Sequence, residues 1–145
     1  MTDSMQIIQE MIEGKRPYPP IAKLLGMRIT GYCDGCTTME IDIDERLYNP
    51  MGTLHGGVYC DLADAAMGIS FFTTLANDEI FTTVDLNITY LKAVKTGKLI
   101  AESKIIRRGK RLGYMECHIT NEEGELVAKA SSTCIIQKGR ERGIL

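Results

Sequence analysis

One stretch of the sequence decides the fold: residues 49–72 read NPMGTLHGGVYCDLADAAMGISFF. The first nine residues contain an Asn-Pro pair and three glycines, a composition typical of a turn. The remainder, Val58–Phe72, predicts a helix of about four turns that is apolar on nearly every side, and such a helix is normally buried. Asp61, Asp64 and Gly68 interrupt this apolar surface along one narrow stripe. Because a carboxylate in a buried helix is unfavourable unless it is paired or functional, the stripe indicates a site.

The segments on either side of this helix predict strands. Before it, residues 27–32 and 37–43 flank an Asp-Gly pair that is typical of a hairpin turn. After it, apolar residues alternate with a period of two from residue 80 to residue 137, in four strands separated by short turns. Short turns join antiparallel neighbours, and a sheet that covers one buried helix must curl around it. The sequence therefore predicts an α+β fold, an antiparallel sheet curled around one long central helix.

The first strand after the helix has a pattern that assigns its side chains to two faces. Ile80, Val84 and Leu86 are expected on one face, and Thr83 and Asp85 on the other.

Both ends of the chain are predicted to be additions to this core. Apolar residues at helical spacing from Met5 to Ile12 predict an amphipathic helix, and Pro20 is expected to open a second short helix that Gly26 ends. Residues 1–25 should thus form an N-terminal helical extension, and residues 138–145 a loose tail. Since no repeat or linker divides the 145 residues, we expect a single domain over residues 1–145.

The overall composition argues against several classes of protein. A net charge of −2, from 17 basic and 19 acidic residues, provides no field that would attract nucleic acid or an anionic membrane. No segment has the pattern of a membrane span or of a signal peptide. Five cysteines without a secretion signal indicate reduced thiols, and we expect a cytoplasmic protein.

Cys33 and Cys36 have the spacing of a redox pair or of half a zinc site. They flank the Asp-Gly turn, however, without a second pair, and the chain has only two histidines. We therefore expect them to be cross-strand neighbours at a hairpin, and we expect no metal.

The start of the central helix predicts a site for a developing negative oxygen. The backbone N–H groups of Gly56 and Gly57 have no partner within the helix, and the helix dipole favours negative charge there. Asp64 follows eight residues later, roughly 12 Å along the helix. A reacting carbonyl must lie about 3 Å from both its oxyanion donor and its attacking group, so one chain cannot supply both. Asp64 of one chain facing Gly56 of another can, which predicts a symmetric homodimer.

These residues resemble a known family. The pattern Asn-x-x-Gly-x-Leu-His-Gly-Gly at residues 49–57, the acid Asp64 and the run VDLNITYL at residues 84–91 resemble the hotdog-fold acyl-CoA thioesterases of the phenylacetic-acid-degradation type. The resemblance covers roughly residues 25–137. It implies hydrolysis of an acyl- or aryl-CoA thioester to free acid and coenzyme A, without metal or cofactor, since coenzyme A enters as part of the substrate. It also implies a dimer with shared active sites that pairs into a tetramer.

The resemblance implies a role for each site residue. Asp64 activates the hydrolytic water or attacks the thioester directly, and the Gly56 N–H holds the oxyanion. His55 and Asn49 bind or orient the thioester carbonyl and the water, and Thr83 supplies a hydroxyl near the water. The structural alternatives are a helix cap for His55, a turn former for Asn49 and an ordinary strand residue for Thr83. A glutamate in place of Asp64 would instead resemble the 4-hydroxybenzoyl-CoA and naphthoyl-CoA branch.

Four cations lie within five residues at one predicted hairpin: Arg107, Arg108, Lys110 and Arg111. They are interpreted either as a solvated turn or as a clamp for the nucleotide phosphates of coenzyme A, because the arginine fork matches phosphate oxygens. The family resemblance favours the clamp.

The alternative function is a non-catalytic acyl-CoA-binding module, as in hotdog regulators that sense a ligand. Such a module needs no acid on its helix, and 145 residues without a helix-turn-helix pattern leave little room for a DNA-binding segment.

Overall fold

A computed structural model describes residues 2–139 of the chain. It contains a six-stranded antiparallel sheet with the strand order β1-β2-β4-β5-β6-β3. The strands are β1 (Arg28–Cys33), β2 (Cys36–Ile43), β3 (Glu79–Tyr90), β4 (Gly97–Arg108), β5 (Leu112–Thr120) and β6 (Leu126–Lys138). The helices are α1 (Asp3–Ile12), α2 (Pro20–Leu25) and α3 (Gly56–Phe72), with a 3-10 turn η1 (Glu45–Leu47) before α3.

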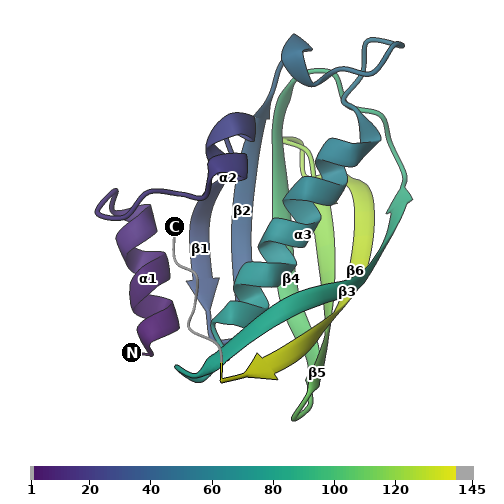
Figure 1. Cartoon of the computed structure of the whole chain (residues 1–145). Helices are drawn as coiled ribbons and strands as arrows, with labels where there is room; N and C mark the ends of the chain where they lie inside the picture. The colour runs from purple at the N-terminus through teal and green to yellow at the C-terminus, as the bar shows by residue number, and fades with distance from the viewer. Residues whose placement is uncertain (1, 140–145) are drawn as a thin grey trace.

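The sheet curls around α3, as the sequence predicts (Figure 1). Apolar side chains of α3 fill the concave side of the sheet: Leu62, Ala63, Ala66 and Met67 are fully buried there. The sheet is open at two edges, β1 and β3, and the N-terminal helices lie beside β1 (Figure 1). The α+β fold with one central helix is confirmed.

One face of α3 is not covered by its own sheet, which corrects the expectation of a helix buried on every side. Asp61 and Asp64 are exposed, and Ala65, Gly68 and Phe72 on the same side of the helix are only half-buried. Burial in the core of a single chain therefore does not account for the apolar residues on this face.

A β-bulge in β3 changes the direction of its side chains. Thr83 pairs with Cys134 and Asp85 pairs with Thr133, so that Val84 is an extra residue in this strand. The bulge brings Thr83 to the same side as Leu86, towards α3, and leaves Val84 59% exposed. The expectation that Val84 shares a face with Leu86, and Thr83 with Asp85, is wrong because alternation with a period of two does not continue through a bulge.

The β1–β2 hairpin confirms one prediction and corrects another. Cys33 and Cys36 are direct cross-strand partners at the turn, as expected. Their sulfur atoms form a disulfide, whereas the sequence favoured reduced thiols. Cys60, Cys117 and Cys134 are free.

The N-terminal helices are attached to β1 through two tyrosine hydroxyls. The Tyr32 hydroxyl of β1 donates to Gln9 Oε1 of α1 at 2.9 Å, and the Ile29 N–H donates to the Tyr18 hydroxyl at 3.0 Å. At the other end, β6 continues through Lys138, so the strand reaches into the predicted tail, of which residues 140–145 lie outside the described residues.

Candidate active site

His55 caps the start of α3. Its backbone is extended, and the Gly57 N–H donates to His55 Nδ1 at 2.9 Å. Because Nδ1 accepts this bond, the neutral ring carries its proton on Nε2, on an exposed side chain. The Gly57 N–H is therefore occupied, which corrects the expectation of two open amides. Within residues 2–139, the Gly56 N–H has no hydrogen-bond partner.

Asn49 closes the turn that precedes α3. Its Oδ1 accepts from the N–H groups of Met51 and Thr53 at 3.0 and 3.1 Å, and its Nδ2 donates to Thr53 Oγ1 at 2.8 Å. This is the geometry of the turn former that the sequence offered as the alternative. In the single chain the amide of Asn49 fixes the loop that carries His55 and Gly56.

Tyr90, at the end of β3, holds the first peptide group of α3. Its hydroxyl donates to the Gly56 carbonyl at 2.7 Å, and its ring packs edge-on against Tyr59 at 5.3 Å between centroids. Burial, with a smaller contribution from Cys60, raises the pKa of Tyr90 to about 12, so the hydroxyl keeps its proton. A Cβ on Gly56 would lie 3.1 Å from this hydroxyl, which explains why glycine suits the position.

Sequence reasoning did not single out Tyr90. The only signal is its place near the end of the run VDLNITYL at residues 84–91, since nothing in a linear pattern indicates that this strand end lies against the start of α3.

Asp64 and Thr83 are brought together by the fold. The Thr83 hydroxyl donates to Asp64 Oδ1 at 3.0 Å, from the bulged part of β3 to the uncovered face of α3. The carboxylate is thus oriented while remaining exposed in the single chain. Asp64 lies eight residues from Gly56 along one continuous helix, roughly 12 Å by helical rise. Within one chain the carboxylate and the open amide do not meet on one carbonyl.

A cavity of about 420 Å³ adjoins Asp64 and Thr83. It extends along the uncovered face of α3 from Asp61 to Phe72, and its lining is mostly apolar. The N-terminal helices and their connector form the opposite wall, with Met11, Tyr18 and Ala22 among the lining residues. An apolar cavity with a carboxylate at one side suits a substrate that joins an apolar group to a reactive polar group.

Asp61 lies one turn before Asp64 on the same face. Partial burial, and then the negative charge of Asp64, raise the pKa of Asp61 above its usual value. Asp61 is therefore protonated more readily than a surface aspartate. Among the described residues, none holds the Asp61 carboxylate by a hydrogen bond as Thr83 holds that of Asp64.

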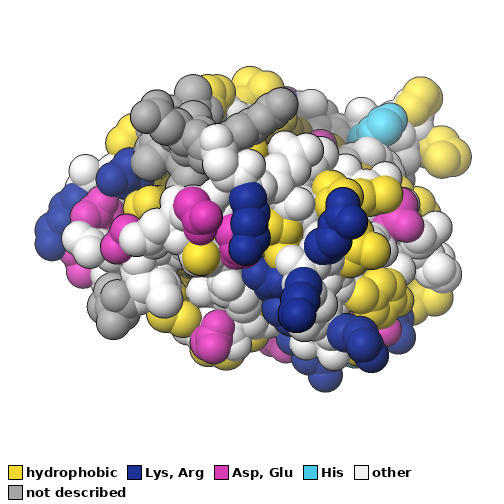
Figure 2. Space-filling model, turned by 60° about the horizontal axis from the view of Figure 1, so that its bottom comes forward, with side chains coloured by type: hydrophobic (Ala, Val, Ile, Leu, Met, Phe, Trp, Pro, Cys, Tyr) yellow, Lys and Arg dark blue, Asp and Glu magenta, His cyan; other side chains and the backbone are white. Residues whose placement is uncertain are grey.

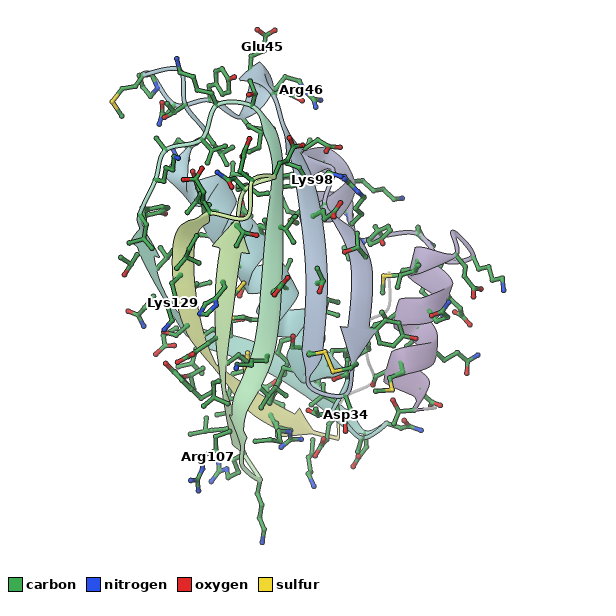
Figure 3. The ribbon with its side chains drawn as sticks, turned by 180° about the vertical axis from the view of Figure 1, so that it is seen from behind. Asp34, Glu45, Arg46, Lys98, Arg107 and Lys129 are labelled. Atoms are coloured by element: carbon green, nitrogen blue, oxygen red, sulfur yellow. A yellow bond between two sulfur atoms is a disulfide. The ribbon has the colours of Figure 1, made fainter. Side chains whose placement is uncertain are left out.

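The four cations at the β4–β5 hairpin do not act as one group. Arg108 turns inward: its Nη2 pairs with Glu79 Oε2 at 3.3 Å, its Nε donates to Thr74 Oγ1 at 3.1 Å, and its guanidinium lies 5.1 Å from the centroid of Phe71. Arg107, Lys110 and Arg111 are exposed. Lys and Arg side chains gather on this end of the molecule (Figure 2), and Arg107 points away from the hairpin (Figure 3).

Within residues 2–139, no group of three or more His, Cys, Asp or Glu side chains could hold a metal ion. No helix in the same range has both the length and the apolar composition to cross a membrane.

Several known proteins are similar to this chain in sequence. Residues 51–128, more than half of the chain, match the family model of the thioesterase superfamily. The chain is 27% identical over 121 residues to 1,4-dihydroxy-2-naphthoyl-CoA hydrolase of Listeria monocytogenes, covering 83% of this chain and 98% of that protein. It is 27% identical over 136 residues to acyl-coenzyme A thioesterase 13 of Homo sapiens, covering 92% and 96%. The first of these names is that of an aryl-CoA hydrolase, and the second is that of an acyl-CoA thioesterase. The naphthoyl-CoA branch is the one that a glutamate in place of Asp64 would have resembled.

The solved structures agree with the sequence relatives. A phenylacetic acid degradation-related protein from Ralstonia eutropha JMP134 superposes with a TM-score of 0.82 at 25% identity, covering 89% of this chain and 98% of the other. With its antiparallel sheet curled around α3, the chain has the hotdog fold and belongs to the thioesterase superfamily.

Proposed function

We propose that this protein hydrolyses acyl-CoA thioesters at a site built from two chains, with Asp64 of one chain and the Gly56 N–H of the other on the same thioester. The supporting observation is the distance between the Asp64 carboxylate and the open Gly56 N–H within one chain. Asp64 is oriented by Thr83 beside an apolar cavity, and the Gly56 N–H is open at the helix start, roughly 12 Å away. A second chain in antiparallel orientation brings each carboxylate to the other chain's amide.

The chemistry follows from these positions. Asp64 takes a proton from water, which attacks the thioester carbonyl, or the carboxylate attacks the carbonyl itself. The Gly56 N–H donates to the oxygen as it gains negative charge, at the positive end of the α3 dipole. Collapse of the tetrahedral intermediate breaks the C–S bond, and the protonated Asp64 returns its proton to the leaving sulfur, so that coenzyme A leaves as the thiol. If the carboxylate itself attacks, collapse leaves an anhydride between the acyl group and Asp64, which water then hydrolyses, and the departing thiolate takes up a proton from that water. The net reaction converts the thioester and one water into a carboxylic acid and a thiol.

Two surfaces of the chain support a dimer. β3 is an open edge strand, and its bulge leaves Val84 59% exposed. Tyr90 at the end of the strand (48%) and Leu91 directly after it (56%) are exposed as well. Open strand edges pair readily with another chain. The half-buried apolar residues beside Asp64 on α3 offer a second surface that a partner would cover. We extend the proposal to a tetramer of two such dimers, as the family resemblance implies.

We also propose that the exposed cations Arg107, Lys110 and Arg111 receive the nucleotide phosphates of coenzyme A, with Arg108 holding the hairpin against Phe71 and Glu79. The proposed location is the cytoplasm. The Cys33–Cys36 disulfide is unusual for that compartment, where thiols are normally kept reduced.

The decisive experiment measures thiol release from benzoyl-CoA and hexanoyl-CoA by the parent and by Asp64→Asn. We expect the variant to lose activity by about 10²–10⁴-fold, because the amide cannot accept a proton from water. Asp61→Asn is the matched control: it removes a carboxylate one turn earlier on the same face, one that Thr83 does not contact, and should lose far less. Undiminished release by Asp64→Asn removes Asp64 from the mechanism. Tight binding without release by the parent favours the non-catalytic binding module.

A further inference from the structure

Gly68 lies in the interior of α3, one helical turn beyond Asp64 and on the same face. It lines the apolar cavity together with Ala65 and Phe72. Glycine in the middle of a helix is unfavourable, because its backbone loses more freedom on folding than that of alanine. A glycine at this position therefore needs a structural or functional reason.

The backbone does not require glycine here. Gly68 is not among the described glycines with positive φ, and as a helical residue it has a conformation that alanine adopts readily. Packing within the single chain does not require glycine either. A Cβ at this position would lie 3.4 Å from Cζ and 3.6 Å from Cε2 of Phe81, which are ordinary van der Waals contacts. Outside α3, Phe81 is the only described residue that a Cβ here would approach within 4 Å, so what the missing side chain preserves is volume in the cavity alongside the edge of that ring.

The width of that space matters most near the reacting group. Gly68 is four residues from Asp64, roughly 6 Å along the helix, so it lies beside the first atoms of an acyl group whose carbonyl is at Asp64. The facing ring of Phe81 is held edge-on against Phe71, with centroids 5.5 Å apart. The gap between Gly68 and this ring holds no more than a methyl group, so a flat or branched group next to the carbonyl would lie in the cavity alongside both, where a side chain at residue 68 would take part of its volume.

We propose that Gly68 is a specificity-determining residue: its missing side chain admits acyl groups that are wide next to the carbonyl, aryl or branched, beside Phe81. This inference rests on the proposed thioesterase function and extends it to the class of acyl group. A straight acyl chain is narrow at the same place and depends less on the open space.

The test compares the parent with Gly68→Ala in kcat/KM for benzoyl-CoA and hexanoyl-CoA. The added methyl group should lower the ratio of benzoyl to hexanoyl activity about tenfold or more, as one methylene of misfit does in a closed pocket. The same substitution should raise the midpoint of thermal unfolding by roughly 2–4 °C, because alanine is the better helix former. If the variant is more stable and yet has a selectively lower kcat/KM for benzoyl-CoA, the loss comes from the shape of the pocket and not from damage to the fold.

Gly31→Ala is the matched control. Gly31 lies in β1 outside the cavity, and a Cβ there would have its nearest neighbour, Thr38, at 3.9 Å, so the substrate ratio should not change. Gly68→Ser repeats the test with a side chain of similar size. An unchanged ratio in both Gly68 variants, or an equal loss for both substrates, overturns the inference.

Binding distinguishes this inference from the proposed function. Titration of benzoyl-CoA into Asp64→Asn and into Asp64→Asn/Gly68→Ala measures the fit without turnover, and we expect about tenfold weaker binding in the double variant. If the parent hydrolyses no thioester but this difference is seen, the thioesterase proposal fails and the role of Gly68 stands. If the parent is active and affinity and ratio are unchanged, only the role of Gly68 fails.

Discussion

Two side chains hold the peptide group between Gly56 and Gly57 in place. His55 accepts the Gly57 N–H, and Tyr90 donates to the Gly56 carbonyl. The open Gly56 N–H belongs to the preceding peptide group, whose His55 carbonyl accepts from the Val58 N–H at 3.0 Å, so its direction is set before any substrate arrives. Preorganised donors of this kind are worth more than donors that must rotate into place during the reaction.

Tyr90→Phe tests whether this hydroxyl positions the oxyanion donor. The variant keeps the ring against Tyr59 and loses only the hydrogen bond, so we expect kcat to fall about threefold to tenfold with little change in KM. Because the pKa of Tyr90 is raised to about 12, the shape of the pH–rate profile between pH 6 and pH 10 should be the same in both proteins. Two results would refute the positioning role. One is a change in KM alone, and the other is an ionisation between pH 6 and pH 10 that the parent shows and Tyr90→Phe lacks.

Asp61 should destabilise the folded chain at neutral pH. Its pKa is raised in the folded state, first by burial and then by the charge of Asp64, so the unfolded chain loses this proton at lower pH than the folded chain. Stability therefore falls as the pH rises through the range where the unfolded carboxyl ionises. Asp61→Asn should raise the midpoint of unfolding at pH 7 by roughly 1–2 °C, a small effect because the group is largely solvated.

Thermal scans at several pH values check the Asp61 prediction. The advantage of Asp61→Asn should shrink on acidification and vanish below about pH 3.9, where the carboxyl is protonated in the unfolded chain as well. An advantage that persists at pH 3, or a lower midpoint at pH 7, would contradict it.

Elements that repeat a regular pattern could be predicted from the sequence, and irregular ones could not. The central helix, the hairpin at Asp34-Gly35 and the run of antiparallel strands follow from spacing and turn residues. The bulge at Val84 does not, because one extra residue leaves no mark on composition and reverses the faces that alternation assigns. It is also what directs Thr83 to Asp64.

The same distinction applies to the site. The motif indicates Gly56 and Asp64 as candidates, because turn glycines and an acid in an apolar helix are visible in one dimension. Contacts between distant segments, such as Tyr90 with Gly56, depend on how the strands are ordered in the sheet. The inward turn of Arg108 likewise depends on Glu79 and Phe71, which arrive from other elements.

The β1–β2 hairpin gives a direct test of the cysteine assignments; its disulfide is visible as the yellow bond near Asp34 in Figure 3. The unfolded, unreduced chain should show three reactive thiols, and five after reduction. In the folded protein Cys60 should react first with a thiol reagent. Cys117 should not react, since burial raises its pKa to about 12 and thiolate is the reactive form. Five thiols before reduction would show that Cys33 and Cys36 are not bonded.

The proposed chemistry needs two copies of the chain. Asp64 and the Gly56 N–H are separated along a rigid helix, and the open edge of β3 and the uncovered face of α3 are available to a partner. An antiparallel arrangement of the two helices would create two equal sites, each with one acid and one amide from different chains.

The shared site can be tested by complementation between two inactive variants. Asp64→Asn removes the acid, and Gly56→Pro removes the amide proton at the first position of α3, where proline is well tolerated after the extended backbone of His55. The added Cβ would lie 3.1 Å from the Tyr90 hydroxyl, so the Tyr90 side chain must shift by a few tenths of an ångström in this variant. Each variant alone should be inactive, and sizing and thermal scans of each serve as controls for folding.

The decisive measurement is thioester hydrolysis after the two variants are unfolded together, refolded and allowed to reassociate at equal concentration. With random pairing, half of the dimers contain both variants and have one intact site of two, so activity should return to about a quarter of the parent value. Activity that stays at the level of the separate variants, while mixed dimers are shown to form, would place the acid and the amide of each site in one chain and contradict the account.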